Sequence, residues 1–474
     1  MADRPTIGRR TLMGRTALGS AVVALGGVAA CTPQDPDDPV PPSTPASSPP
    51  ADENPFEVER DQVVELVAFT GRYRIAPFEA LGEIYTDQWG PGLRVEEAAK
   101  VTSTLQPRFE EQSPPDVFVN GGSESLPLTE LVGQGALTDL GPLLDARTVD
   151  DEDVRIRDLL RPEAIEAGTV DGTVVELHYA LAVWGLWHSK GLFEHHDWEP
   201  ASTMDAFMTL CEQIASTTSQ PPLVHGGLHA ETMATLICHQ AIKQGGQDVL
   251  LKLDNLDPDA WTQDAVFATV KRWEEIAAEG WIHPDSATLD AVEAEQRWLA
   301  GEAALVPGGS WLESEVGGIP EGITAAFSPL PSLDATDELP YEALGTDPGL
   351  PFSVPEQASN RNGGLEFLRM ALSEDGVRAF QQATGAVCTV IDAADQVEDP
   401  SAVLSSVLEA VDAAGDDLFD LRCLRWYGEL RTAARDTTRR LLSGEATTDQ
   451  FVATMQRATD RVAGDPQVTK FRRT

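Results

Sequence analysis

The residues best suited to chemistry in this sequence are aromatic side chains that follow turns or strand ends. Trp311 comes directly after a Gly-Gly-Ser turn at 308–310, and Glu313 lies two positions further on. Tyr73 follows the first apolar run of the chain. A ring held on such a turn can lie flat against the apolar face of a ligand, while a nearby carboxylate accepts hydrogen bonds. We therefore expect non-covalent binding here, with an ordinary core tryptophan as the alternative for Trp311.

Patterns that would support metal or covalent chemistry are weaker. His225 and His229 have a ligand-like spacing, but the Gly-Gly pair at 226–227 predicts a turn instead of one helix face. The acidic run at 254–259 lacks the glycine and the final glutamate of an EF-hand loop. The chain has no G-x-S-x-G motif and no phosphate-binding Gly-Lys loop. We expect no metal, no cofactor and no catalytic residue, although the 77 acidic residues could supply the carboxylate pair of a glycoside hydrolase.

Charge and composition exclude several classes of protein. The chain has 474 residues, a formal net charge of −43 and a sequence pI near 4.3. Such a surface repels the phosphates of nucleic acids. The hydrophobic fraction of 42% excludes global disorder, and no apolar run reaches the roughly 18 residues of a membrane-spanning helix. The length allows two or three domains, or one body with two lobes.

The first 57 residues predict export and anchoring. Arg9 and Arg10 precede a short apolar region that ends at residue 30, as in a secretory signal. The segment Val-Ala-Ala-Cys at 28–31 resembles a bacterial lipobox, which implies cleavage before Cys31 and lipidation of its thiol. Residues 31–57 are rich in Pro, Ser and Asp and predict a solvated tether. We expect a lipid anchor at the extracellular face of the cell membrane, reached by the twin-arginine or the general secretion route; the alternative is a plain signal with a chance cysteine.

The other four cysteines are too sparse for a disulfide framework. Cys211 and Cys238 lie in apolar helical patterns, so we expect buried free thiols there. Export would permit a disulfide among these two, Cys388 and Cys423, and the sequence leaves that pairing open.

The first part of the body alternates between strand and helix patterns. Apolar runs at 63–69, 93–95 and 117–119 predict strands, and the stretches between them have helical spacing. This order is typical of an α/β assembly with a mainly parallel sheet, whose ligands bind beyond the carboxyl ends of the strands. Asn120 and Ser123 follow the third strand and could supply polar groups at such an edge.

Further along, residues 174–189 form a long apolar stretch without helical period, which predicts an extended segment that crosses the molecule. Trp184 and Trp187 lie in it, and we expect Trp187 in the core. Helical patterns dominate afterwards, at 204–214, 232–242, 261–278, 365–372, 377–380, 421–442 and 448–463.

Five segments together resemble the extracellular sugar-binding proteins of ABC importers. They lie, in order, at 115–119, 179–193, 298–311, 364–368 and 443–448. The segment at 298–311 (W-L-A-G-E-A-A-L-V-P-G-G-S-W) is similar to the one that carries a ligand-stacking aromatic in this family. Within the family, shorter matches resemble the actinobacterial binding lipoproteins for N-acetylglucosamine and N,N′-diacetylchitobiose; they lie at 105–109, 114–116, 184–187, 309–313 and 366–369.

This resemblance implies a two-lobed α/β fold of the periplasmic-binding-protein type, class II. One lobe would comprise 58–183 plus 344–388, and the other 184–343 plus 389–474. The resemblance implies a sugar in the cleft between the lobes, hinge closure around it, and delivery to the permease subunits by a monomeric binding protein that is not an enzyme. The alternatives are a binding protein for another oligosaccharide, a sensor lipoprotein with the same fold, or a secreted glycoside hydrolase.

A pyranose ring has an apolar face and a rim of hydroxyls, so its site needs a flat aromatic surface and short polar groups. By position or by the resemblance, the candidates are Trp311, Trp426, Trp184, Tyr73, Asn120, Ser123, Asp347, Glu313 and Tyr427. The alternative for Trp426 and Tyr427 is helix packing, and for Asp347 it is the capping of a turn. Arg108 and Asp116 are expected to be structural.

Overall fold

The computed structural model describes residues 54–60, 62–71, 73–90, 92–122, 125–393, 397 and 399–473. The predicted leader, Cys31, most of the predicted tether and Ser123 lie outside the described residues.

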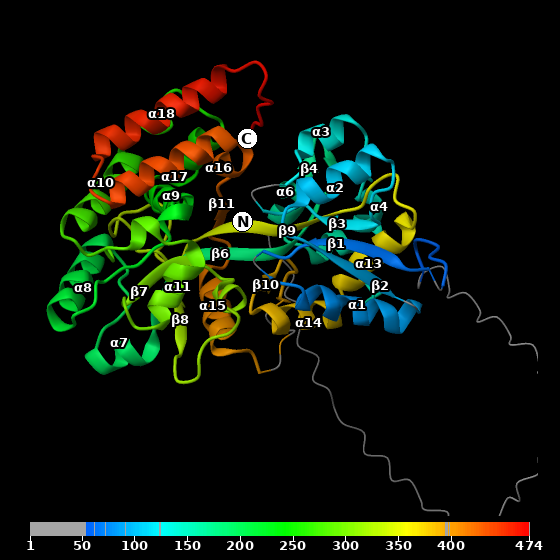
Figure 1. Ribbon diagram of the computed structural model, residues 1–474, viewed down its shortest axis with the longest axis horizontal. Coiled ribbons are helices and arrows are strands. Elements are labelled where there is room, and N and C mark those ends of the chain that lie inside the picture. The colour runs from blue at the N-terminus through cyan, green and yellow to red at the C-terminus, as the bar shows by residue number, and fades with distance from the viewer. Residues whose placement is uncertain are drawn as a thin grey trace, which may run out of the picture. The chain divides into compact units, whose positions relative to one another are not determined.

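The first predicted strands and helices are confirmed. Strand β1 (Val64–Phe69) lies between β2 (Leu93–Ala98) and β3 (Val117–Val119), and all three run parallel. Helix α1 (Ala76–Trp89) leads from β1 to β2, and α2 (Val101–Glu110) leads from β2 to β3. The spacing of its apolar residues gives α1 one buried face, which packs on the core of this sheet (Figure 1).

The predicted crossing segment is strand β6 (Leu177–Ser189), of which all but the last residue are buried. Its first part, up to Val183, pairs with β9 (Leu344–Ser353). Its second part, from Trp184, pairs with β7 (Leu305–Gly309) and β8 (Ala325–Ser328). The strand therefore joins two sets of elements, which lie on either side of Figure 1.

The complete sheet is mixed. Its order is β10-β6-β9-β3-β1-β2, with β7 and β8 on β6 and β11 on β9. Strand β9 runs antiparallel to both β3 and β6, so the expectation of a mainly parallel sheet holds for β1 to β3 but not for the complete sheet, in which only β11 with β9 adds a further parallel pair among the described strands. Local patterns cannot show this, because β9 enters the sheet from a distant part of the chain.

Helices dominate the part of the body that follows β6. Helix α8 (Met204–Thr217) begins at Thr203, whose side chain accepts a hydrogen bond from the backbone N–H of Ala206. Helix α9 (Glu231–Asp254) bends at Gly246, where φ is 63°. Helices α10 (Asp264–Ala278) and α17 (Gly428–Leu442) pack with it, and α18 (Thr448–Gly464) packs with both of them.

The predicted helix at 421–442 is divided in two. Helix α16 (Cys423–Trp426) ends at Tyr427, which has extended backbone angles, and α17 follows. The remaining elements are α3 (Leu128–Gly133), α4 (Gly141–Asp145), α5 (Ile156–Leu159), α6 (Pro162–Ala167), β4 (Thr169–Val170), β5 (Thr173–Val174), α7 (Lys190–His196), η1 (Gly227–His229), η2 (Ser286–Thr288), α11 (Ala291–Leu299), α12 (Leu312–Val316), α13 (Arg361–Ala371), α14 (Glu374–Thr384), β10 (Val387–Cys388), α15 (Ala402–Ala414) and β11 (Leu418–Asp420).

Several core residues follow the sequence analysis. Trp187 is fully buried, and its indole N–H donates to the carbonyl of Gly309 over 3.0 Å. Cys211 and Cys238 are buried free thiols, as are Cys388 and Cys423. Within the described part of the chain, no helix has the length and apolarity needed to span a bilayer.

Candidate functional site

Two of the predicted tryptophans lie against each other where β6 changes partners. Trp184 on β6 is opposite Gly309 on β7, and Trp311 follows that strand. Their ring centroids are 4.7 Å apart with an interplanar angle of 88°, which is the edge-to-face arrangement that aromatic pairs favour. Each residue is only 5% exposed. The structure therefore brings these two candidates together as a closely packed pair.

The position of Trp311 depends on a glycine. A Cβ atom on Gly309 would lie 2.0 Å from the indole ring, so the ring can fold back over β7 only because Gly309 lacks a side chain. The indole N–H donates to Oε2 of Glu315, one turn further along α12, over 2.7 Å. These contacts hold the ring in one orientation.

A small cavity of about 30 Å³ lies beside Trp311. Glu295 and Glu315 line it together with His225. Burial, the charge of Glu315 and a hydrogen bond with Glu315 raise the pKa of Glu295 well above its usual range. Burial lowers the pKa of His225 to about 4, so its ring is neutral at pH 7. The cavity is therefore lined by a protonated carboxyl group and an uncharged imidazole.

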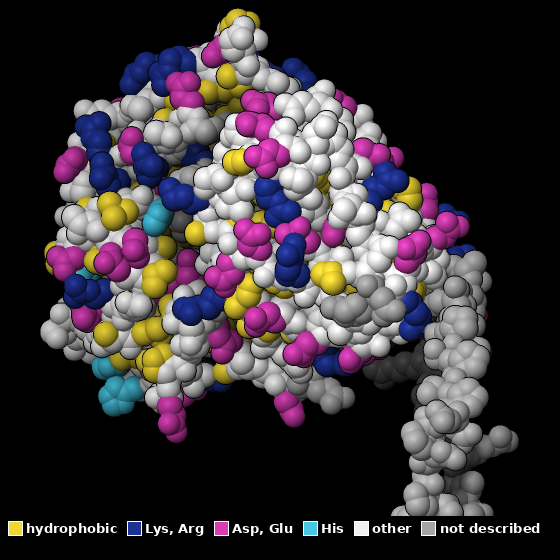
Figure 2. Space-filling model, turned by 45° about the vertical axis from the view of Figure 1, so that its right-hand side comes forward, with side chains coloured by type: hydrophobic (Ala, Val, Ile, Leu, Met, Phe, Trp, Pro, Cys, Tyr) yellow, Lys and Arg dark blue, Asp and Glu magenta, His cyan; other side chains and the backbone are white. Residues whose placement is uncertain are grey.

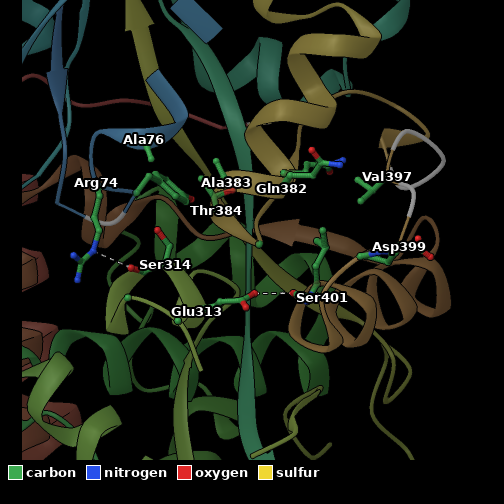
Figure 3. A pocket seen from close by; sticks show the side chains of 17 residues that line it. Arg74, Ala76, Glu313, Ser314, Gln382, Ala383, Thr384, Val397, Asp399 and Ser401 are labelled. Atoms are coloured by element: carbon green, nitrogen blue, oxygen red, sulfur yellow. Dashed lines mark hydrogen bonds between the residues drawn. The ribbon is translucent and has the colours of Figure 1, made fainter. Parts of the chain in front are cut away.

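A larger pocket, of about 450 Å³, lies at the other side of α12. Tyr73 and Glu313, both predicted site residues, line it. Its walls come from the start of α1, from α12 with the two glycines after it, from the end of α14 and from the start of α15 (Figure 3). The side chain of Arg74 donates to the carbonyl of Ser314 over 3.3 Å, and Ser401 donates to Glu313 over 2.7 Å.

Sequence reasoning missed several polar residues of this pocket. Arg74, Gln382 and Thr384 line it and were not among the candidates. Arg74 directly follows Tyr73 and could have been found from the same loop argument. Gln382 and Thr384 lie in the last turn of α14, where the local sequence shows only a helix end at Gly385, whose φ is 64°.

Asn120 is directed into its own loop. Its side-chain oxygen accepts from the N–H of Leu126 over 2.8 Å, and its amide nitrogen donates to the carbonyl of Leu126 and to Glu176. The residue is 8% exposed and lines neither the pocket nor the small cavity. Its hydrogen-bonding groups are used to shape the loop.

Asp347, Trp426 and Tyr427 lie together at a third place. Asp347 forms an ion pair with Arg425 over 2.6 Å. The Trp426 ring lies 5.0 Å from that of Phe471 near the C-terminus, and the hydroxyl of Tyr427 accepts from the Phe471 N–H over 3.0 Å. None of the three lines either cavity, because their side chains are engaged with α16 and the C-terminal segment.

Residues expected to be structural have structural contacts. Asp116 accepts from the N–H of Glu65 over 2.9 Å and of Asn360 over 2.7 Å, which links β1, β3 and the start of α13. Arg108 binds both carboxylate oxygens of Glu65. His229 ends the short turn η1, which confirms the predicted turn. Among the described residues, no group of three or more His, Cys, Asp and Glu side chains is arranged to hold a metal ion.

Charged side chains of both signs lie on the face of the molecule seen in Figure 2. In the face seen in Figure 2, Lys and Arg are interspersed with Asp and Glu.

Two α/β assemblies joined by the crossing strands β6 and β9 define a two-lobed fold of the periplasmic-binding-protein type. The chain belongs to the bacterial extracellular solute-binding protein family, whose model matches residues 79–378. This confirms the family resemblance found in the sequence.

The chain is similar to named relatives. It is 31% identical over 473 residues to the diacetylchitobiose binding protein NgcE of Streptomyces coelicolor, with 98% of each chain covered. A solved structure of a chitin oligosaccharide binding protein has a TM-score of 0.66 at 17% identity, covering 84% of this chain and 98% of the other. The raffinose complex of the binding protein RafE has a TM-score of 0.63 at 14% identity, covering 84% and 100%. These two structures support the fold alone.

Proposed function

We propose that this protein captures N-acetylglucosamine or a chitooligosaccharide outside the cell and delivers it to the permease of an ABC importer. The observation that carries the proposal is the 31% identity, over 98% of both chains, with a diacetylchitobiose binding protein. A match of this extent includes both sets of elements that β6 joins. It favours a binding protein over an enzyme.

The sugar would bind between two lobes, which comprise 58–183 plus 344–388 and 184–343 plus 389–474. Support comes from the 450 Å³ pocket, whose volume is within the roughly 300–1,000 Å³ of small-molecule sites. Tyr73 and Thr384 reach it from the first proposed lobe, and Glu313 and Ser401 from the second. Hydroxyl, amide and carboxylate groups at its wall can satisfy the polar rim of a sugar. A ligand with contacts to both lobes would favour the closed arrangement.

The protein would be held at the membrane through Cys31, with residues 31–57 as the spacer. Replacement of Cys31 by Ser removes the thiol that would be lipidated, so we expect Cys31→Ser to release the protein into the medium. Fractionation of cells that express the wild type and the variant would measure this. Equal membrane retention of both would contradict the lipid anchor and would leave sugar binding untouched.

The binding proposal is tested by calorimetry with diacetylchitobiose, N-acetylglucosamine and cellobiose. Cellobiose has the same linkage and no acetamido groups, so it serves as the matched control ligand. We expect saturable binding of at least one N-acetylated sugar and at least tenfold weaker binding of cellobiose. Absence of binding to all three would contradict the proposal. Chromatography of the recovered ligand completes the test, because released monosaccharide would identify a glycoside hydrolase.

A further inference from the structure

Two buried polar atoms without a protein partner belong to residues that line the 30 Å³ cavity beside Trp311. They are Nδ1 of His225 and Oε2 of Glu295, and each of these residues is 5% exposed. His229, at the rim of the same cavity, is already engaged, because its Nδ1 accepts from the N–H of Ala291 over 3.4 Å.

Such atoms are unfavourable for the fold. Leaving one buried polar group without a hydrogen bond costs roughly 1–3 kcal/mol, and most buried polar groups in proteins are paired. The two atoms therefore need a partner from outside the protein. A water needs roughly 10–15 Å³, so a cavity of about 30 Å³ admits a hydroxyl or a hydroxymethyl group but not a sugar ring.

The chemistry of the lining selects the kind of group. Burial and the neighbouring Glu315 raise the pKa of Glu295, so its carboxyl group carries a proton and can both donate and accept hydrogen bonds. Glu315 in turn accepts from the indole N–H of Trp311. A hydroxyl group donates one hydrogen bond and accepts others, so it satisfies Glu295 and an Nδ1–H of His225 at the same time.

We propose that this cavity is a subsite that receives one hydroxyl group of the bound sugar, which His225 and Glu295 hold while Trp311 forms the wall beside it. This inference rests on the proposed function. It extends the candidate site from the 450 Å³ pocket to the opposite side of α12 and predicts an uncharged, polyhydroxylated ligand. A permanently bound water has the same hydrogen-bonding chemistry, and the experiment must separate these two sources.

The test measures diacetylchitobiose affinity and thermal stability for His225→Phe and Glu295→Met. We expect at least tenfold weaker binding in each variant. We also expect an unchanged or higher Tm for free His225→Phe, because an apolar group of similar shape replaces an unpaired polar one. Glu295→Met also removes the hydrogen bond to Glu315 and should lower the Tm. Glu295→Gln retains a donor toward Glu315 and a free acceptor, so it should bind like the wild type. The double variant His225→Phe/Glu295→Met should lose less than the sum of the single losses, since both residues hold the same hydroxyl.

His188→Phe is the matched control. His188 is also buried with an unpartnered Nδ1, but it lies on the far part of β6 and lines neither cavity. We expect unchanged affinity in this variant. Wild-type affinity in His225→Phe and Glu295→Met would overturn the subsite and assign the cavity to water only. The subsite would also be overturned if His225→Phe and Glu295→Met lost affinity only in proportion to their loss of Tm, and if His188→Phe lost both in the same way. Failure of the wild-type protein to bind any of the sugars would contradict the proposed function itself, before any variant is compared.

Discussion

Trp311 takes part in three contacts that together determine what its ring can do. Its edge-to-face contact with Trp184 fixes one side, its N–H bond to Glu315 fixes the orientation in the ring plane, and its ring lines the small cavity. With 5% of its surface exposed, it has little area for a ligand until the surrounding elements move. The proposed contact between this ring and a sugar would therefore require a rearrangement of the elements packed on it.

Trp311→Ala should weaken binding of diacetylchitobiose by about 1–3 kcal/mol if the ring contacts the sugar. The same change should lower the free energy of unfolding by about 3–5 kcal/mol, because it removes a buried aromatic ring. Calorimetry and urea denaturation measure the two effects. Trp311→Phe, which keeps a ring and loses the bond to Glu315, should show smaller effects in both. Unchanged affinity in Trp311→Ala would remove the residue from the site.

His188 makes a pH-dependent contribution to stability. Its ring packs on Phe193 at 4.4 Å, and burial lowers its pKa to about 4. The unfolded chain, with a histidine pKa near 6.5, binds a proton that the folded protein excludes between about pH 6.5 and 4. The contribution is therefore present above pH 6.5 and is lost as the pH falls. The stability of the wild type relative to His188→Phe should drop by up to about 3 kcal/mol from pH 7 to pH 4, as measured by urea denaturation; a constant difference would contradict the burial of a neutral ring.

Helix α12 is the element that links the two cavities. It has five residues, and Trp311 precedes its first turn. Glu315 is directed to the small cavity beside Trp311, while Glu313 and Ser314 line the large pocket. Strand β7 sets the position of this helix through its pairing with β6. A displacement of β7 would therefore change both cavities together.

The two glycines of β7 offer a matched pair of variants. A Cβ on Gly309 would lie 2.0 Å from the Trp311 ring, whereas a Cβ on Gly308 would meet its nearest atom, on Trp187, at 3.7 Å. Gly309→Ala should lower the free energy of unfolding by about 1–3 kcal/mol, as overpacking does, and should weaken sugar binding because the ring is displaced. Gly308→Ala should leave the Tm almost unchanged. Equal Tm values for the two variants would contradict the packing described for Trp311.

At the scale of the whole molecule, a buried ion network holds the C-terminal segment. Asp254 is fully buried and accepts from the N–H groups of Arg422 and Cys423 over 2.8 Å and from Arg473 over 2.9 Å. Phe471 packs on Trp426 beside it. Arg473 and Phe471 thus connect the end of α9 with β11 and α16. Phe471 packs on the ring of Trp426, which was expected to contact a sugar.

Arg473→Met should lower the free energy of unfolding by about 3–5 kcal/mol, because it leaves the buried Asp254 carboxylate without its cation. Burial raises the pKa of Asp254. Above the unfolded value near 3.9, folding must therefore either take up a proton at this carboxyl group or bury its negative charge, so the loss should increase as the pH rises. Denaturation with urea at pH 4 and pH 7 measures the effect. Adding Asp254→Asn should recover much of the loss, and no recovery would contradict the pairing.

Much of the fold could be predicted from local patterns. The apolar runs at 63–69 and 117–119, the helical spacing of α1 and the long extended stretch of β6 all correspond to observed elements. These patterns are reliable because burial of one face requires a fixed period along the chain. The start of α16 was not predictable from local patterns, since the N–H groups of Arg422 and Cys423 there donate to Asp254, more than 160 residues away.

The sequence by itself determined the family, the crossing strand and the placement of Trp311 and Glu313 next to a glycine turn, because all three are contained in short stretches of chain. Only the tertiary structure decided which side chains share a cavity. Thr384 and Tyr73 line one pocket although about 300 residues separate them. Phe471 packs on the ring of Trp426, and the side-chain amide of Asn120 is hydrogen-bonded within its own loop. The physical reason is that cavities form where distant elements fail to fill space, and no periodicity along one segment records which other segments pack against it.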